Sequence, residues 1–204
     1  MLDKLNSGRY LSNLAFCGGT MLRLCFGLDR YSVDLDFWMV GEVKEKQLLK
    51  DLTQYLSRDY SIKDSMDKKD TLLIELKSDA YPRRLKLEIR KGLKKIKTER
   101  VIAYSKYSNL QVMVKAVSLD EMARSKVSAF LDRREIRDAF DLEFLVKKGI
   151  RIEEPKERLE MILQGLDKLT PLDYKVKLGS VLEPQMRQYY VKENFKLLRS
   201  SVTD

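Results

Sequence analysis

The chain has 204 residues, of which 44% are hydrophobic and 35% are charged, enough for one domain or for a compact core with a smaller helical half. It contains no histidine, which excludes a Ser-His-Asp triad, a Cys-His dyad and a His-ligated zinc site. The net charge of +9 favours a polyanionic partner such as RNA or a nucleoside triphosphate.

The first half of the chain alternates between predicted strands and helices. Apolar and polar residues alternate over the strands, and apolar residues recur at helical spacing between them. The predicted strands lie at residues 14–16, 33–40, 71–77, 84–90 and 111–115, and the predicted helices lie at 21–26 and 44–58. A mixed sheet of four or five strands flanked by helices is therefore expected.

From Ser118 onward the pattern is wholly helical. Ser118-Leu119-Asp120-Glu121 is a capping box that opens the first of these helices. The predicted helices lie at residues 118–131, 135–148, 155–166, 171–182 and 184–198. The fold class is α+β, with a catalytic core over 1–117 and a helical region over 118–204 that we expect to complete the active site and pack on the core.

No stretch of the sequence approaches the roughly 20 apolar residues that span a bilayer. The N-terminal segment carries acidic and polar residues at positions where a secretory signal would be apolar. A cytoplasmic protein with no membrane segment is therefore predicted. Cys17 and Cys25 do not have the spacing of zinc ligands or of a redox pair, so buried thiols are expected.

Two acidic residues on the second predicted strand are candidate metal ligands. Asp34 and Asp36 share one face of a strand, with their side chains on the order of 7 Å apart. Paired carboxylates bind divalent cations, and in the absence of histidine such a site favours Mg²⁺ or Mn²⁺. Phosphoryl and nucleotidyl transfer use these cations to neutralise a triphosphate. The alternative is an exposed strand face that carries acids without a metal.

A glycine turn precedes these acids. Gly18 and Gly19 follow a strand and open a helix, so their amides can approach a phosphate closely, and Thr20 adds a hydroxyl donor. A glycine pair alone predicts no more than a turn. The order strand, turn, helix and acidic strand is more specific than any one of these elements.

Two stretches of this region, FCGGTMLRL at 16–24 and RYSVDLDF at 30–37, resemble the nucleotidyltransferases of the AbiE-type abortive-infection toxin family. These belong to the polymerase-beta-like superfamily, whose motif is a glycine turn followed by Asp-x-Asp or Asp-x-Glu. The family also has a helical motif, which Lys126, Arg133 or Arg134, and RDAFDL at 137–142 match. The resemblance covers residues 14–148 and implies transfer of a nucleotide from a nucleoside triphosphate (NTP), in some members onto tRNA.

The helical motif also stands out from the residues themselves. Lys126 lies on the apolar stripe of its helix, where a lysine is costly unless it meets an anion. A salt bridge to Asp138 or Asp141 would satisfy it, and so would the phosphates of an NTP, which the resemblance favours. Asp138 and Asp141 share a helix face, where they either staple helices together or border the active site.

The resemblance suggests three further residues for the site. Glu88 is the candidate third metal ligand, although the superfamily more often has an aspartate on that strand. Ser32 and Arg23 match family positions, where Ser32 would bind a phosphate oxygen and Arg23 either a phosphate or a structural partner.

The basic segment 90–97, followed by Tyr104 and Tyr107, suits an RNA backbone and unstacked bases, or is a solvated loop.

These features predict a metal-dependent nucleotidyltransferase with an RNA acceptor, tRNA being favoured. Gly18, Gly19 and Thr20 hold phosphates, and Asp34 and Asp36 hold Mg²⁺. The alternatives are a catalytically silent nucleotide- or RNA-binding module of the same fold, and a toxin whose role depends on an antitoxin partner.

Overall fold

The computed structural model describes residues 1–203, which separate into two compact units. The sheet unit comprises residues 1–27 and 32–117, and the helical unit comprises residues 28–31 and the chain from 118 onward. The sequence placed a boundary after residue 117, and the two units also divide there. It assigned residues 28–31 to the catalytic core, whereas this short segment belongs to the helical unit.

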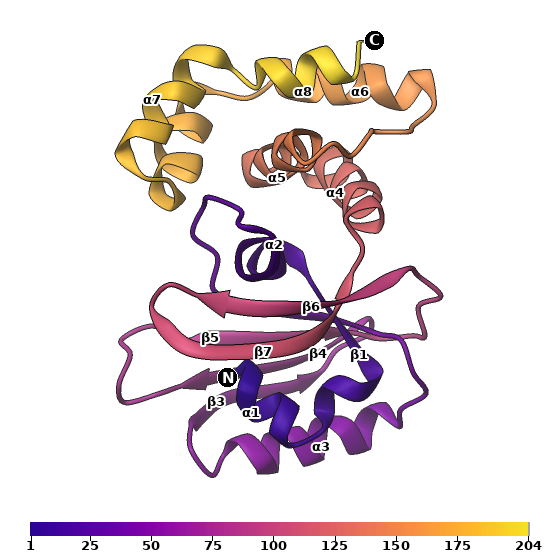
Figure 1. Cartoon of the computed structure of the whole chain (residues 1–204), viewed down its shortest axis with the longest axis vertical. Coiled ribbons are helices and arrows are strands. Elements are labelled where there is room, and N and C mark those ends of the chain that lie inside the picture. Colours follow the sequence, from indigo (N-terminus) through magenta and orange to yellow (C-terminus); the bar gives the residue numbers. More distant parts are fainter. Residues whose placement is uncertain (204) are drawn as a thin grey trace. The chain divides into compact units, whose positions relative to one another are not determined.

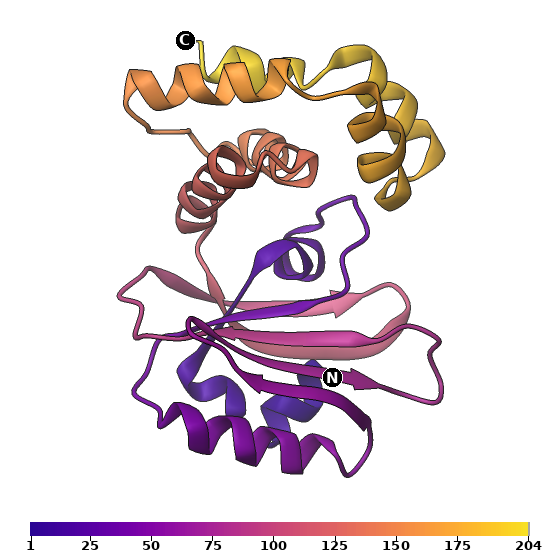
Figure 2. The ribbon, with the colours of Figure 1, turned by 180° about the vertical axis from the view of Figure 1, so that it is seen from behind.

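The sheet unit is built around one mixed sheet with helices on both faces (Figure 1, Figure 2). Its elements are α1 (Leu2–Ser7), the 3₁₀ helix η1 (Tyr10–Asn13), β1 (Leu14–Cys17), α2 (Gly18–Phe26), β2 (Leu35–Met39), α3 (Glu45–Leu56), β3 (Ser61–Asp67), β4 (Thr71–Lys77), β5 (Leu85–Arg90), β6 (Thr98–Ser105) and β7 (Ser108–Val117). The views in Figures 1 and 2 show α1 and α3 on one face of the sheet and α2 on the other.

The sheet has seven strands in the order β3-β4-β5-β2-β1-β7-β6. β1 pairs antiparallel with β2 and parallel with β7, while β2 pairs parallel with β5. The predicted mixed sheet with flanking helices is confirmed. The central strands β1 and β2 run in opposite directions, so the end of β1 and the start of β2 lie side by side.

Buried and half-buried residues alternate along β2, so its two faces have different roles. Leu35, Phe37 and Met39 are buried, and Leu87 and Ile89 on β5 lie in register with the first two of them. Asp36 is in register with Glu88 and with Cys17, and successive residues of a strand point to opposite faces. One face of β2 therefore contributes to the core, and the other carries the acidic residues.

The prediction of four or five strands was too low. The two strands at the sheet edges, β3 and β6, were not predicted from the sequence. Most of the side chains of β3 are exposed, so this strand lacks the alternation of apolar and polar residues that marks β2 and β5. An edge strand is stabilised by backbone pairing with its neighbour, which leaves little trace in its composition.

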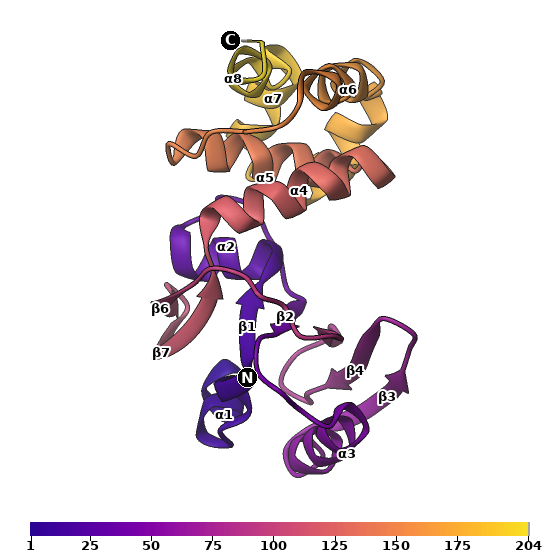
Figure 3. The ribbon, with the colours of Figure 1, turned by 90° about the vertical axis from the view of Figure 1, so that its right-hand side faces the viewer.

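In the helical unit, residues 118–203 form helices that are joined by turns and irregular segments (Figure 3). Its elements are α4 (Leu119–Arg133), α5 (Ile136–Lys147), α6 (Lys156–Asp167), the π-helical segment η2 (Asp173–Leu178), the 3₁₀ helix η3 (Gly179–Val181), α7 (Pro184–Glu193) and α8 (Lys196–Ser201). The hydroxyl of Ser118 accepts a hydrogen bond from the Glu121 amide at 3.4 Å, which confirms the predicted capping residue of α4.

Two of the predicted C-terminal helices differ in detail. The helix expected over 171–182 is a π-helical segment followed by a 3₁₀ turn. The helix expected over 184–198 is interrupted because Asn194 and Phe195 have φ values of 49° and 54°, outside the helical region. Within residues 1–203, no helix has the length and apolar character needed to traverse a membrane.

Candidate active site

The glycine turn and the second aspartate of the pair lie against each other. Gly18 is the first residue of α2, and its φ of +76° is one that side chains rarely adopt. A Cβ placed on Gly18 would lie 2.4 Å from Oδ2 of Asp36, which is closer than any real contact of this kind. The lack of a side chain at position 18 therefore allows the Asp36 carboxylate to reach the N-terminus of α2.

Gly27 provides a matched comparison for this close approach. It has a φ of +80° and would place a Cβ in open space. We expect Gly27→Ala to cost about 1–2 kcal/mol of stability from backbone strain alone, without loss of activity. Gly18→Ala adds a collision with Asp36 to the same strain, so it should abolish nucleotide transfer. Urea unfolding and a transfer assay of both variants test this, and equal activity of the two would contradict it.

Ser32 is held to α2 by two of the residues predicted to bind phosphate. The hydroxyl of Thr20 donates to Oγ of Ser32 at 3.0 Å, and Nη1 of Arg23 donates to the Ser32 carbonyl at 3.2 Å. These bonds bring the glycine turn and the segment before β2 together. Phosphate binding by Gly19, Thr20, Ser32 and Arg23 stays a prediction.

The three predicted metal ligands are arranged unequally. Asp34 is exposed and lies one residue before β2, Asp36 is half-buried, and Glu88 is half-buried beside Asp36 on β5. Across residues 1–203, no three acidic, cysteine or histidine side chains gather into a group that could hold a metal ion. Mg²⁺ commonly uses one or two carboxylates and takes its remaining ligands from substrate phosphates and water, so Asp34 and Asp36 fit this ion without Glu88.

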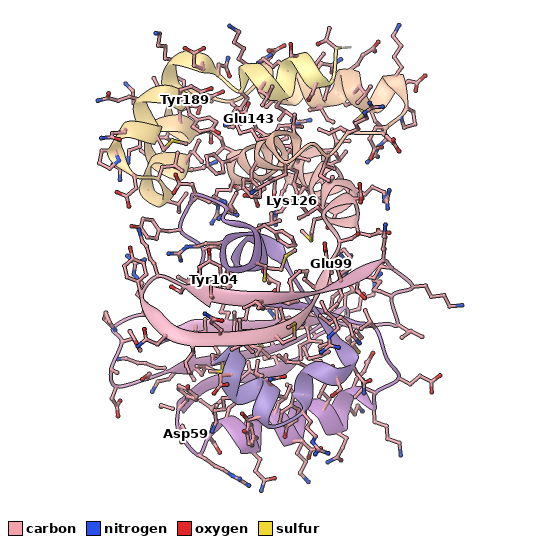
Figure 4. The ribbon with its side chains drawn as sticks, viewed as in Figure 1. Asp59, Glu99, Tyr104, Lys126, Glu143 and Tyr189 are labelled. Carbon is pink, nitrogen blue, oxygen red and sulfur yellow. The ribbon has the colours of Figure 1, made fainter. Side chains whose placement is uncertain are left out.

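Lys126, which is labelled in Figure 4, belongs to a largely buried ion cluster within the helical unit. On α4 its Nζ lies 2.9 Å from Oδ1 of Asp138 and 2.6 Å from Oδ2 of Asp141, both on α5. Nε of Arg133 contacts Asp138 at 2.7 Å, and Arg30 donates to both oxygens of Asp141 at 2.6 and 2.8 Å. The salt bridge that the sequence offered as one alternative is therefore present. Phosphate contact by Lys126 stays a prediction.

All members of this cluster are held in their charged forms. Burial lowers the pKa of Lys126, but the attraction of Asp141 and Asp138 outweighs it, so the pKa is raised above its usual value. Burial raises the pKa of Asp141, but Lys126 and Arg30 outweigh it and hold the pKa below its usual value. The pKa of Asp138 is also lowered, since Arg133 and Lys126 overcome the effect of burial.

The cluster has an excess of positive charge. Its three cations, Lys126, Arg30 and Arg133, face two carboxylates, Asp138 and Asp141. Each aspartate also has an arginine partner, but the Arg133 side chain is 57% exposed, whereas Lys126 and Arg30 are each only 8% exposed. A buried cation in excess favours a nearby anion.

Arg30 is a residue of the cluster to which the sequence gave no role. It is buried, and its guanidinium forms a bidentate pair with the fully buried Asp141, which lies 111 positions later in the chain. Arg30 lies in a short segment without periodicity, so no local pattern indicates burial. The one feature of the sequence that could have indicated a role for Arg30 was its position in the RYSVDLDF stretch.

The basic segment predicted to contact RNA is partly engaged within the protein. Lys91 forms ion pairs with Asp67 and, at 3.5 Å, with Glu45. Tyr104, labelled in Figure 4, and Tyr107 are exposed. Exposed tyrosines are available for base stacking, and Lys91 is better described as structural.

A mixed sheet in which a glycine turn at a helix N-terminus meets the second aspartate of an Asp-x-Asp motif is the arrangement that the resemblance to nucleotidyltransferases implies. The family described as "Nucleotidyl transferase AbiEii toxin, Type IV TA system" matches residues 1–192. The chain belongs to this family and is a nucleotidyltransferase, as its sequence motifs predicted.

Solved structures share the fold at low sequence identity. JHP933 from Helicobacter pylori is 19% identical, with a TM-score of 0.56, 98% of this chain covered and 94% of that one. A putative nucleotidyltransferase from H. pylori is also 19% identical, with a TM-score of 0.56 and coverages of 99% and 96%. MenT4, a nucleotidyltransferase toxin from Mycobacterium tuberculosis H37Rv, is 14% identical, with a TM-score of 0.57 and coverages of 91% and 75%. No curated protein shows significant similarity to the chain.

Proposed function

We propose that this nucleotidyltransferase is metal-dependent and transfers a nucleotide from an NTP to RNA, with tRNA as the favoured acceptor. Asp34 and Asp36 would hold Mg²⁺ or Mn²⁺, and Gly18, Gly19 and Thr20 would bind the phosphates. The observation that carries this proposal is the carboxylate of Asp36 lying against Gly18 at the start of α2. This contact supports the proposal because it puts a candidate cation ligand beside the candidate phosphate-binding amides within the sheet unit.

The chemistry requires a hydroxyl of the acceptor to attack the α-phosphorus of the NTP. A new phosphorus–oxygen bond forms, the bond from the α-phosphorus to the bridging oxygen breaks, and pyrophosphate leaves while the hydroxyl proton passes to water. A divalent cation supplies charge neutralisation of the triphosphate when it is bound. The amides of the α2 N-terminus bind phosphate oxygens, and the hydroxyl of Thr20 adds a donor beside Ser32.

The excess charge of the helical cluster supports anion binding by Lys126. Its ammonium is already bonded to Asp138 and Asp141, but both aspartates also have an arginine partner. Lys126 can therefore meet a phosphate oxygen without leaving either carboxylate unpaired. This is the role that we propose for it.

Removal of the metal tests the dependence directly. We expect the protein to transfer label from an α-³²P-labelled NTP to total tRNA in the presence of Mg²⁺. Excess EDTA should stop the reaction, and added Mn²⁺ or Mg²⁺ should restore it. Each of the four NTPs is assayed separately, with total tRNA, ribosomal RNA and the protein itself as acceptors. Transfer that persists in EDTA would contradict the proposed metal dependence. Label found on protein alone would contradict the proposal that RNA is the acceptor.

The family description also includes a toxin–antitoxin system, from which we propose an antitoxin as a partner. Expression of the protein should arrest bacterial growth, and co-expression of the product of the adjacent gene should relieve the arrest. Asp36→Asn is the control, since it should be harmless at the same level of protein. Growth arrest by Asp36→Asn would show that toxicity does not depend on nucleotide transfer.

A further inference from the structure

Residues 28–31 belong to the helical unit, although in the sequence they stand between two stretches of the sheet unit. Leu28 is buried, and the amide of Tyr31 donates to the carbonyl of Val181 at 2.8 Å. The hydroxyl of Tyr31 donates to Glu183 at 2.5 Å. Side-chain and backbone contacts therefore attach this segment to the helices.

Arg30 makes the most buried of these attachments. Its Nε and Nη2 donate to Oδ1 and Oδ2 of Asp141 at 2.6 and 2.8 Å, and Nη1 donates to the Tyr31 carbonyl at 3.1 Å. Lys126 also lies on Asp141, so charge neutralisation alone does not require the arginine. A planar guanidinium that bonds both oxygens of a carboxylate fixes the orientation of the arginine side chain as well as its distance from the carboxylate. An ammonium group fixes only the distance.

The residues that follow Arg30 are predicted to act in the reaction. Ser32 is bonded to Thr20 and Arg23, and β2 begins at Leu35, so Val33 and Asp34 form a two-residue link between fixed points. Asp34 lies four positions after Arg30, which allows no more than about 14 Å of extended chain between them. Loss of the Arg30 contacts would therefore weaken the attachment of the segment that leads into Asp34, while the bonds of Ser32 to Thr20 and Arg23 would remain.

From these contacts we propose that Arg30, paired with Asp141, is a positioning residue that fixes the loop carrying Ser32 and the metal-ligating Asp34. Arg30 acts through the peptide chain and does not touch the substrate. The catalytic consequence rests on the proposed function, whereas the fixing of the loop does not. Asp141 thereby acts as the anchor of this loop, and Asp138, which lacks a bond to Arg30, is paired with Lys126 and Arg133.

The first test measures hydrogen exchange of the protein without ligands. In Arg30→Gln the amides of residues 28–34 should exchange at least about tenfold faster than in the wild type, because the segment opens locally. Arg30→Lys keeps the charge without the planar pair and should be intermediate. Arg199→Gln is the matched control: it removes the arginine of the Arg199–Asp167 ion pair, 2.7 Å long, in the same helical unit. It should leave exchange at 28–34 unchanged.

The second test measures transfer against Mg²⁺ concentration. Arg30→Gln should lower kcat by about 100-fold, the cost of a small misplacement of reacting groups, and raise the half-saturating Mg²⁺ concentration by about tenfold. Arg199→Gln should change neither, and a simple loss of folded protein would lower the rate without moving the Mg²⁺ dependence. Should Arg30→Gln unfold, Arg30→Lys provides both measurements.

Unchanged exchange at 28–34 in the Arg30 variants, or an equal change in Arg199→Gln, would overturn the proposal. So would an unaltered Mg²⁺ dependence in an active Arg30 variant. If the wild type transfers no nucleotide to any acceptor, the proposed function fails by itself. The exchange experiment still decides whether Arg30 fixes the loop.

Discussion

Replacement of Asp36 by asparagine is expected to abolish nucleotide transfer while the protein remains folded. The substitution keeps the size of the side chain that lies against Gly18 and removes the charge that a divalent cation requires. A cation contributes several kcal/mol to the transition state and each 1.36 kcal/mol is a factor of ten, so transfer should fall by about three orders of magnitude or more. Initial rates with labelled NTP and tRNA measure the loss, and circular dichroism measures folding.

Asp79→Asn is the control for this experiment. Asp79 is an exposed acid of the same unit, in the turn between β4 and β5, so its loss changes the net charge of the protein equally. It should transfer nucleotides at the wild-type rate. Transfer by Asp36→Asn at a rate within tenfold of the Asp79→Asn rate would refute the role of Asp36 as a metal ligand.

Much of the sheet was predictable because its central strands are patterned by burial. On β5, Leu87 and Ile89 face the core while Glu88 faces away, and β2 has the same alternation. The edge strand β3 was missed because most of its side chains meet water on both faces. Pairing with a neighbouring strand is a property of the backbone, and composition records it poorly.

In the candidate site, too, the sequence predicted the contacts that follow from a local motif and missed those between distant parts of the chain. Gly18 and Asp36 come from adjacent ends of antiparallel strands, so a local motif of turn and strand sufficed to bring them together. The pair of Arg30 with Asp141 joins residues 111 positions apart, and no periodicity links them. Lys126 was predicted to face inward, but only the structure shows that each of its aspartates has a second cation.

Removal of Asp141 is expected to destabilise the protein more than removal of Lys126, although the two residues form one ion pair. Asp141→Asn leaves three cations facing one carboxylate, with Arg30 buried and without a charged partner. Breaking a buried pair in this way costs about 3–5 kcal/mol. Lys126→Met leaves two arginines facing two aspartates, keeps the apolar stem, and should cost no more than about 2 kcal/mol.

Urea unfolding followed by circular dichroism at helical wavelengths measures both free energies. Lys175→Met provides the control, since Lys175 is exposed in the same unit and its loss should change the free energy of unfolding by less than about 0.5 kcal/mol. The double variant Lys126→Met with Asp141→Asn should be less destabilised than the sum of the two, because removal of Lys126 lowers the excess charge that Asp141→Asn creates. A larger loss from Lys126→Met than from Asp141→Asn would show that Lys126 is a structural counter-ion with no charge to spare for a phosphate.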